Sequence, residues 1–511
     1  MSRVTRHVIG VDIGTQSTKA LLVDEAGRIL AQASEAYQVD TPEPLWAEQW
    51  PEVWMTAVVR CIARVVREAA IDAASVKALC VSSLYGGSGI PVDAEGQPTH
   101  PCLIWMDRRA QDEVEWVRGH VDLERLYDIT GNGVDSYHGF TKMLWLREKR
   151  PDAWQRTRAF LPPNSFVNAQ LTGEVAVDHS SAGNIGGVYD MKARRWSAEM
   201  LDALGIPASM MPARLVESSE TVGGLTAHWA QTLGLPIGLP VIAGGVDAAV
   251  ATLAAGANRP GSHVAMIGTS MCWGTIRQHA DARDGLVSMP HVVGGLRDLY
   301  VFGGAITAGA SVTWFLDLMQ PQQGRATHTA DAHAQLEQAA RELPPGAQGL
   351  LFLPYLMGER SPIWDPRASG AFIGLGLHHR REHLYRAVLE GVACALRHNI
   401  EAGSREGQPL DDALVVVGGA SRSDLWMQII ADVTGRPVRT IHEEVEASLG
   451  AAMLAALGAG LTAAETVGQG WVHLVDRAQP YPDAVARYEA LYRNYLAGYP
   501  ALRPVMHALR G

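Results

Sequence analysis

A single aspartate at the end of an apolar run is the first candidate for chemistry. Asp247 ends the run Pro-Val-Ile-Ala-Gly-Gly-Val-Asp, which begins at residue 240. The glycine pair lets another molecule approach the backbone closely. The apolar neighbours would desolvate the carboxylate, and desolvation raises the pKa of an aspartate toward the range of a general base. Asp is also a preferred residue at a helix start, and residues 248–255 favour a helix, so Asp247 could serve both roles.

Two hairpins with glycine and threonine at their turns could hold phosphate. They span residues 8–23 and 264–275, one on either side of Asp247. The tip of such a hairpin offers backbone N–H groups and hydroxyls to an anion. Each hairpin alone could be an ordinary tight turn, but their recurrence favours phosphate binding. The candidate residues are Asp12, which could hold a hydrated magnesium ion, and Gly14, Thr15, Thr18, Lys19, Gly268 and Thr269.

A third glycine-rich element resembles a nucleotide loop. An apolar strand over residues 413–417 ends in Gly418 and Gly419 and leads through serines into a helix that begins near Asp424. Nucleotides bind at the carboxyl ends of such strands. The chain has neither the glycine spacing of a dinucleotide-binding fold nor that of a P-loop, so a different nucleotide-binding fold is expected.

Composition excludes several classes of protein. A chain of 511 residues is too long for one core, which predicts two large domains. A net charge of −11 without a basic block argues against a nucleic-acid partner. Five scattered cysteines indicate neither disulfides nor a zinc site and favour the reducing cytoplasm. The uncharged stretch 447–464 is rich in Ala and Gly, which favours a buried helix over a membrane span.

The elements that must position these residues recur in the same order on both sides of Asp247. The first copy predicts strands near residues 8–13, 17–23, 28–34 and 77–82, with a helix over 52–70. The second copy predicts strands near 263–267, 271–277, 299–303 and 414–417, with helices from 310, over 382–401 and over the Ala-rich stretch. Both copies are α/β. A terminal helix from residue 480 is expected to pack across the two domains.

The ordered motifs resemble the FGGY carbohydrate kinases of the actin-like ATPase superfamily. The resemblance covers nearly the whole chain and is carried by residues 12–19, 46–54, 104–109, 244–247, 268–270, 308–311, 358–362, 370–391 and 418–419. It implies an α/β fold of two ribonuclease-H-like domains flanking a catalytic cleft. Residues 1–253 would form the sugar-binding domain and residues 254–511 the nucleotide-binding domain. ATP and Mg²⁺ are the implied cofactors, and a homodimer is expected.

The resemblance also assigns roles to single residues. Asp247 would accept the proton of the attacking sugar hydroxyl, and Asp12 would hold magnesium. Thr15, Lys19 and Thr269 would surround the β- and γ-phosphates, while Gly309 would open a helix whose positive end faces phosphate. Gly419 and Ser423 would line the adenine pocket. The expected sugar contacts, each of which could instead be plain packing, are Tyr85, Trp105 and Tyr137.

The sequence leaves the sugar open. Residues 82–88 depart from the Gln-Met-His-Gly motif that xylulokinases usually carry, and Ala248 replaces their usual Asn. Residues 246–248 and 268–272 are more similar to ribulokinases, whereas the run Trp46–Trp54 is xylulokinase-like. We expect an ATP-dependent kinase for a small sugar, with a ketopentose such as xylulose or ribulose favoured. The alternatives are rhamnulose, fuculose, erythritol and glycerol.

A rival function comes from the same superfamily, which includes actin-like and chaperone-like ATPases. Those proteins need no base aimed at a carbohydrate hydroxyl. Asp247 and the Gly-Glu-Arg-Ser-Pro motif at residues 358–362 therefore favour the kinase.

Overall fold

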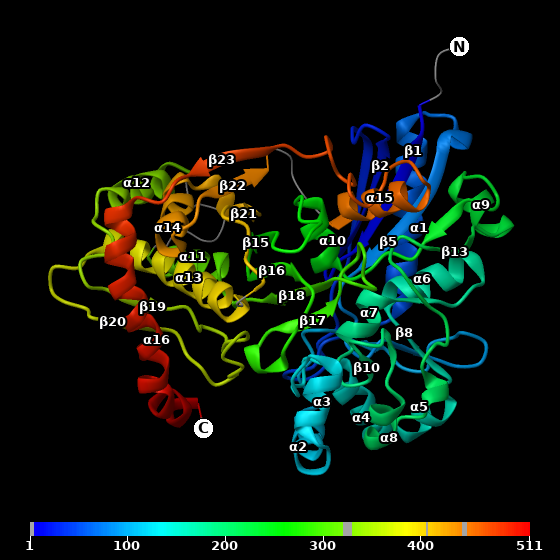
Figure 1. The fold of residues 1–511 in the computed structure, drawn as a ribbon, viewed down its shortest axis with the longest axis horizontal. Coiled ribbons are helices and arrows are strands. Elements are labelled where there is room, and N and C mark those ends of the chain that lie inside the picture. Colours follow the sequence, from blue (N-terminus) through cyan, green and yellow to red (C-terminus); the bar gives the residue numbers. More distant parts are fainter. Residues whose placement is uncertain (1–4, 320–329, 405–406, 442–446, 511) are drawn as a thin grey trace.

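The chain folds into two α/β halves, each built on one mixed sheet, in a computed structural model that describes residues 5–319, 330–404, 407–441 and 447–510 (Figure 1). In spatial order the first sheet contains β13 (Thr221–Gly224), β14 (Pro240–Ile242), β5 (Val76–Ser83), β1 (His7–Ile13), β2 (Ser17–Asp24) and β3 (Ile29–Ala36). The second contains β17 (Val287–Pro290), β18 (Leu299–Gly303), β16 (Met271–Arg277), β15 (His263–Ile267), β21 (Leu414–Val417), β22 (Val438–Ile441) and β23 (Leu474–Ala478).

The two sheets share one local topology. In the first, β1, β2 and β3 form antiparallel hairpins, and β5 lies parallel to β1. In the second, β15, β16 and β18 are antiparallel, and β21 lies parallel to β15. The parallel strands are continuous apolar runs because helices cover both faces of the sheet. The strands predicted from the sequence are confirmed, with ends that differ by at most two residues.

Helices from distant parts of the chain cover the first sheet. α1 (Pro51–Ala69) packs on β2 and β3 and buries one stripe at helical spacing, which includes Trp54, Val58 and Ile62. α15 (Ala447–Gly458), drawn in orange in Figure 1, packs on β1 and β5 on the other face. The Ala-rich stretch is therefore a buried helix, as predicted, although in the sequence it lies between β22 and β23 of the second sheet.

Further helices lie between β5 and β14 and extend the first half away from its sheet (Figure 1). They are α2 (Gln111–His120), α3 (Leu123–Thr130), α4 (Gly139–Lys149), α5 (Pro151–Arg156), α6 (Pro163–Thr172), α7 (His179–Asn184), α8 (Ala198–Leu204) and α9 (Ala227–Leu233). After β14 comes α10 (Asp247–Ala254), which packs against α15.

Glycine allows α15 to pack this closely. A Cβ added at Gly10 on β1 would lie 2.1 Å from the Ser448 carbonyl oxygen, and one at Gly450 would lie 2.1 Å from the Val250 carbonyl oxygen. Backbone therefore meets backbone on both sides of the helix, and neither contact leaves space for a methyl group.

Replacing Gly450 with alanine should destabilise the fold by about 1–3 kcal/mol or more, because the methyl group would push α15 away from α10. Urea unfolding measures the effect. The matched control is Gly119→Ala on the exposed end of α2, where an added Cβ meets nothing within 4 Å; this change should be neutral or slightly stabilising. Equal effects of the two substitutions would contradict the close packing.

The second half packs its helices around α13 (Arg381–Gly403) and α14 (Asp424–Thr434). The terminal helix α16 (Pro482–Arg510) lies on α14, α13 and β19 (Leu351–Leu353). Its tyrosines bond within this half, for example Tyr488 to Arg386 and Glu390 of α13. A terminal helix was predicted correctly, but the expectation that it packs across both halves is wrong, because it packs on α14, α13 and β19 of the second half.

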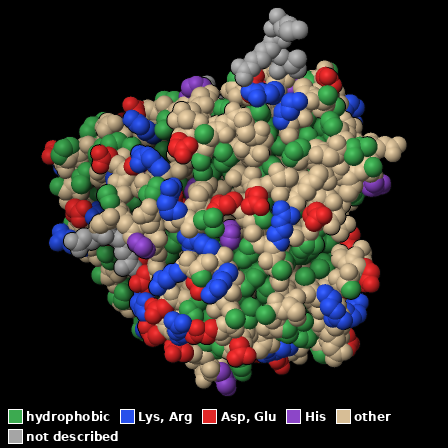
Figure 2. Space-filling view, turned by 45° about the vertical axis from the view of Figure 1, so that its right-hand side comes forward, with side chains coloured by type: hydrophobic (Ala, Val, Ile, Leu, Met, Phe, Trp, Pro, Cys, Tyr) green, Lys and Arg blue, Asp and Glu red, His purple; other side chains and the backbone are tan. Residues whose placement is uncertain are grey.

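The two halves also touch directly. The Asn132 amide donates to the Ser288 carbonyl oxygen at 2.9 Å, and the Ser288 backbone N–H donates back to the Asn132 amide oxygen at 2.8 Å. α7 packs on β17 beside this contact. Acidic and basic side chains are interspersed on the face shown in Figure 2. Of the helices described, none is both long and apolar enough to cross a membrane.

Candidate active site

Asp247 is the first residue of α10 and is separated by Val246 from the glycine pair that follows β14. The helix-capping position is Val246, so Asp247 lies one residue inside the helix, and its carboxylate accepts a hydrogen bond from the Ala248 N–H at 2.7 Å. The preceding turn is held by buried side chains: the Val246 N–H donates to Ser180 Oγ at 3.2 Å, and the Asn164 amide donates to the Ala243 carbonyl oxygen at 3.1 Å. The carboxylate is therefore presented from a fixed backbone.

The environment of Asp247 suits a proton acceptor. Burial raises its pKa to about 8, and the nearby Asp12 carboxylate adds to the rise. Asp12 is at the carboxyl end of β1, where its Oδ1 accepts a hydrogen bond from Ser82 Oγ at 2.9 Å. A carboxyl group with a pKa this close to neutrality can act as a general base.

A cavity of about 350 Å³ connects Asp247 with residues of both halves. It brings together seven of the residues predicted from the sequence: Asp12, Thr15, Tyr85, Trp105, Tyr137, Asp247 and Gly268. The rings of Tyr85 and Tyr137 lie 5.0 Å apart, and the indole N–H of Trp105 donates to Thr15 Oγ1 at 3.1 Å. One end of the cavity thus carries two carboxylates, and one wall is aromatic with polar edges, which suits a small hydroxylated molecule.

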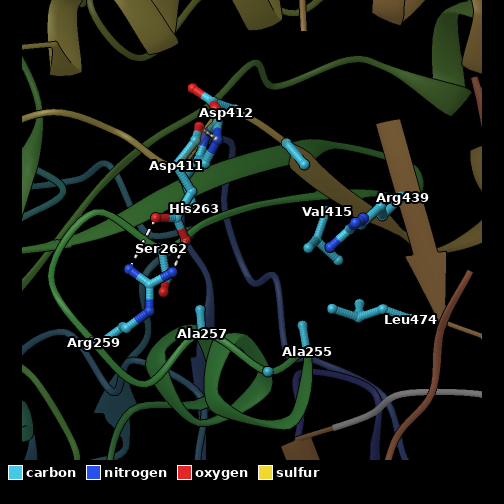
Figure 3. Close-up of a pocket in the computed structure, with 12 residues that line it drawn as sticks. Ala255, Ala257, Arg259, Ser262, His263, Asp411, Asp412, Val415, Arg439 and Leu474 are labelled. Atoms are coloured by element: carbon cyan, nitrogen blue, oxygen red, sulfur yellow. Dashed lines mark hydrogen bonds and ion pairs between the residues drawn. The ribbon is translucent and has the colours of Figure 1, made fainter. Parts of the chain in front are cut away.

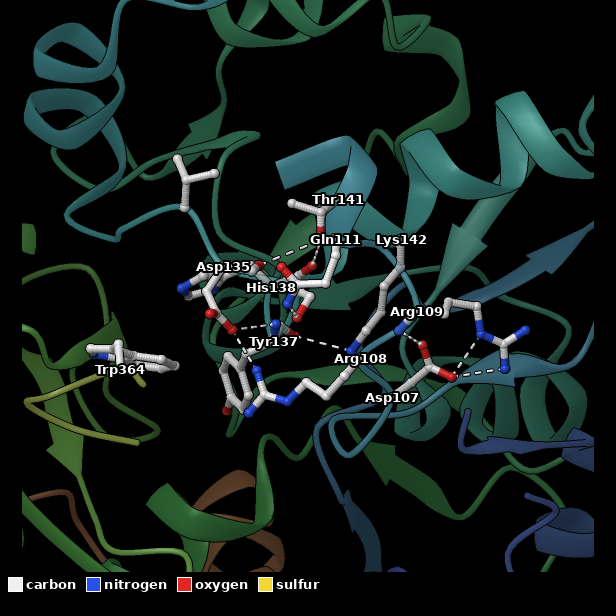
Figure 4. A network of polar contacts seen from close by, with 12 residues as sticks. Asp107, Arg108, Arg109, Gln111, Asp135, Tyr137, His138, Thr141, Lys142 and Trp364 are labelled. Carbon is white, nitrogen blue, oxygen red and sulfur yellow. Dashed lines mark hydrogen bonds and ion pairs between the residues drawn. The ribbon is translucent and has the colours of Figure 1, made fainter. Parts of the chain in front are cut away.

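A network of polar contacts surrounds Tyr137 of this aromatic wall and fixes its position (Figure 4). The Tyr137 N–H donates to Asp135 at 2.7 Å, Asp135 pairs with Arg108, and the Arg108 guanidinium lies 5.7 Å from the centre of the Tyr137 ring. The fully buried Lys142 donates to the carbonyl oxygens of Tyr137 at 3.1 Å and Ile104 at 2.8 Å, and burial lowers its pKa to about 7. The tyrosine is therefore fixed by both its ring and its backbone.

A second cavity, of about 940 Å³, opens in the other half. It shares Gly268 with the first cavity and is also lined by the predicted residues Thr269, Gly309, Gly419 and Ser423. α11 (Gly309–Met319) begins directly at the tip of the β15–β16 hairpin, where the Gly309 N–H donates to the Gly268 carbonyl oxygen at 2.9 Å. A helix start beside a glycine–threonine tip favours phosphate at the junction of the two cavities.

The far end of this cavity could hold the flat base of a nucleotide. Ser423 Oγ accepts from the Trp426 N–H at 3.1 Å at the start of α14 and donates to Glu337 at 2.8 Å. Glu337 lies on α12 (Ala330–Arg341). Trp314, Tyr385 and Trp426 also line the cavity and supply aromatic surface for a flat ring.

Comparison with known proteins agrees with this geometry. The family model for the N-terminal domain of the FGGY family of carbohydrate kinases matches residues 7–254, and the model for its C-terminal domain matches residues 263–459. The chain belongs to the FGGY family of carbohydrate kinases. It is therefore a sugar kinase with the two-domain actin-like ATPase fold, as the sequence predicted.

Curated relatives of this FGGY kinase include the xylulose kinase of Lactococcus lactis, which is 31% identical over 98% of each chain. A gluconokinase of Bacillus subtilis is 28% identical over 96% of this chain and 94% of its own. Among solved structures, the xylulose kinase of Rhodospirillum rubrum superposes with a TM-score of 0.89 at 33% identity, covering 98% of this chain and all of its own.

Four predicted site residues of the FGGY kinase do not line either cavity: Gly14, Thr18, Lys19 and Gly418. Thr18 is fully buried, and its hydroxyl bonds to Tyr37 Oη at 3.1 Å. The Gly14 N–H closes the first hairpin turn on the Ser17 carbonyl oxygen at 2.9 Å. Lys19 lies opposite Asp12 in the β1–β2 register. Gly418 ends β21 with a φ of 93°, a conformation that favours glycine.

Several cavity residues were not predicted from the sequence. The first cavity is also lined by Cys272, Phe302 and Arg360, and the second by Trp314, Glu337 and Trp426. Arg360 belongs to the Gly-Glu-Arg-Ser-Pro motif, so the sequence did give a signal for it. No comparable signal marked Glu337, because α12 brings it to Ser423 from 86 residues away.

A third hollow of about 450 Å³ lies beside the connection from α10 to β15 (Figure 3). It contains none of the predicted residues, and both arginines that line it are paired: Arg259 with Asp411 at 2.9 Å and Arg439 with Asp476 at 2.8 Å. The chemistry of the FGGY kinase is therefore assigned to the two connected cavities.

Proposed function

We propose that this FGGY kinase transfers the γ-phosphate of ATP to a hydroxyl of a ketopentose, with xylulose as the first candidate. The observation that carries the proposal is the junction at Gly268, where a small cavity containing a carboxylate with a raised pKa meets a larger cavity with a helix start and aromatic walls. The names of the relatives support xylulose. The departures at residues 82–88 and Ala248 keep ribulose as the nearest alternative.

In this proposal each group of residues has a separate role in phosphoryl transfer, a reaction that depends mainly on positioning the reactants and balancing their charge. Asp247 takes the proton of the attacking hydroxyl, while Tyr85, Trp105 and Tyr137 orient the sugar. Thr15, Thr269 and the start of α11 surround the phosphates, and Lys19 supports them from beside Asp12. Gly419 and Ser423 line the adenine site. Residues 1–253 then act as the sugar-binding domain and 254–511 as the nucleotide-binding domain, in a protein we propose to be a cytoplasmic homodimer.

Magnesium fits this arrangement at Asp12. Hydrated Mg²⁺ takes one or two carboxylates and keeps several waters. Asp12 supplies a carboxylate, and its Oδ1 accepts a hydrogen bond from Ser82 Oγ. When bound, the ion would offset negative charge on the phosphate oxygens.

The test is a panel of acceptors in an assay that follows both ADP release and phosphosugar formation. It contains xylulose, ribulose, rhamnulose, fuculose, erythritol and glycerol. We expect kcat/KM to be highest for a ketopentose and to exceed that for the polyols erythritol and glycerol by about tenfold or more. ATP hydrolysis at the same rate without any acceptor would instead support an actin-like or chaperone-like ATPase.

A further inference from the structure

An arginine without a counter-ion among the described residues lines the cavity that contains Asp247. Arg360 comes from the second half of the molecule, whereas Asp247 belongs to the first. Its Nε is buried and has no hydrogen-bond partner, and no carboxylate in the described part of the chain forms an ion pair with its guanidinium. An uncompensated charge that is partly removed from water is costly. Such a group indicates a ligand that supplies the missing oxygen atoms.

The acidic residues closest to Arg360 in the sequence are committed elsewhere. Glu359 is buried and accepts hydrogen bonds from the backbone N–H groups of Ile306 at 3.1 Å and Arg360 at 2.7 Å. Burial raises the pKa of Glu359 to about 8, although both backbone hydrogen bonds and the charge of Arg360 oppose the rise, so Glu359 offers little negative charge at neutral pH. Asp365 is bonded to Tyr499 and His507 of α16, both at 2.6 Å.

The loop that carries Arg360 is fixed. Glu359 and Asp365 exchange two backbone hydrogen bonds at 2.9 and 3.0 Å, and the Trp364 N–H donates to the Arg360 carbonyl oxygen at 2.6 Å. Gly304, after β18, makes room for the side chain, since a Cβ there would lie 2.8 Å from one terminal nitrogen of the guanidinium. The backbone that carries the guanidinium is therefore fixed, which reduces the entropy cost of binding an acceptor.

Electrostatics place the guanidinium next to the predicted sugar wall. Burial raises the pKa values of Tyr137 and Cys272, and the positive charge of Arg360 opposes both rises. Arg360 does not contribute to the shift at Asp247, whose charged neighbour is Asp12. The cavity thus contains two carboxylates from the first half and one guanidinium from the second.

We propose that Arg360 recognises the acceptor by donating hydrogen bonds to a carbonyl or carboxylate oxygen remote from the hydroxyl that Asp247 deprotonates. The inference rests on the proposed function, since it requires the acceptor to bind in this cavity. A guanidinium has only donors, so it favours strong acceptor oxygens over hydroxyl groups. A ketose or a sugar acid should therefore bind better than the polyol of the same length. Because Arg360 and Asp247 come from different halves, the acceptor also joins the halves when it binds.

Three five-carbon acceptors separate the possible oxygen sources: xylulose carries a carbonyl, xylonate a carboxylate, and xylitol only hydroxyls. Calorimetry without nucleotide gives the dissociation constant of each for the wild type and for Arg360→Gln. We expect Arg360→Gln to weaken binding of xylulose, xylonate or both by roughly 10- to 150-fold, with little change for xylitol. A larger loss for xylonate identifies a carboxylate partner, and a larger loss for xylulose identifies a carbonyl.

Kinetics and two further variants complete the test. In Arg360→Gln the KM of the acceptor should rise while the KM of ATP stays within about twofold, and Arg360→Lys should recover part of the loss because it keeps the charge. The matched control is Arg439→Gln, an exposed residue of β22 outside both cavities, which should bind like the wild type. A melting temperature at or above that of the wild type is expected for Arg360→Gln, because the change removes a desolvated charge.

Two results would overturn the inference. An unchanged dissociation constant for xylulose and xylonate in Arg360→Gln would show that the acceptor does not meet the guanidinium. A lower kcat with unchanged binding would place Arg360 on the transferred phosphoryl group instead. Failure of the proposed function looks different, because the wild type itself would then show no sugar-dependent turnover.

Discussion

Replacing Asp247 with asparagine should lower kcat by two to four orders of magnitude while nucleotide affinity stays unchanged, because the general base is lost and the nucleotide cavity is not altered. Asparagine matches the size of aspartate, and its amide oxygen can still accept the hydrogen bond from the Ala248 N–H. Steady-state kinetics with the best ketopentose, together with calorimetry with ADP, measure the two parts. Near-normal turnover in this variant would refute the assignment of Asp247 as the base.

The same substitution should make the protein more stable at neutral pH, which separates lost catalysis from lost folding. The pKa of Asp247 is about 8 in the folded protein, against about 4 for an unfolded aspartate. Between these values the folded state binds a proton that the unfolded state does not, so the free energy of unfolding falls as pH rises, by up to about 1.4 kcal/mol per pH unit. Asparagine does not ionise. The stability advantage of Asp247→Asn should therefore grow from pH 4 to pH 8, and a lower melting temperature at pH 8 would contradict the buried carboxylate.

Replacing Asp12 with alanine should raise the magnesium concentration required for half-maximal activity and reduce kcat/KM for ATP by about 100-fold or more, because the proposed ion would lose its carboxylate ligand. A magnesium titration at saturating sugar measures the effect. The change also removes one of the two causes of the raised pKa of Asp247. The pKa of the base should fall, so the acid-side limit below which activity is lost should move to lower pH. The control is Asp476→Ala, on exposed β23. An unchanged magnesium titration would refute the role of Asp12.

The sequence was sufficient for the elements that have a strong local signal. The apolar runs around Ile9 and Val416 and the glycine turns beside them predict the parallel strands and hairpins, and these are confirmed. Asp247 was predicted as a site residue because a charged residue seldom ends an apolar run, and the structure places it in the lining of the first cavity. The ordered motifs then gave the family, which the domain matches confirm.

Other features depend on tertiary contacts that local patterns do not encode. The Ala-rich surface of α15 suits either sheet, and it is the tertiary packing, with backbone against backbone at Gly10, that places it on the first. Strand alternation puts Thr18 and Lys19 on opposite faces of β2, yet the sequence does not say which face meets the cleft. The lack of a counter-ion for Arg360 among the described residues is a property of its surroundings, so no motif could predict it.

The position of α15 also constrains how the kinase can move. The chain passes between the two sheets three times: after α10, between β22 and α15, and between α15 and β23. Two bodies joined by one tether can swivel and slide freely, whereas three tethers remove most of those degrees of freedom. We expect the remaining motion to be a bending of one half toward the other, which would return Asp247 and Arg360 to a similar separation in each catalytic cycle without a search over relative orientations.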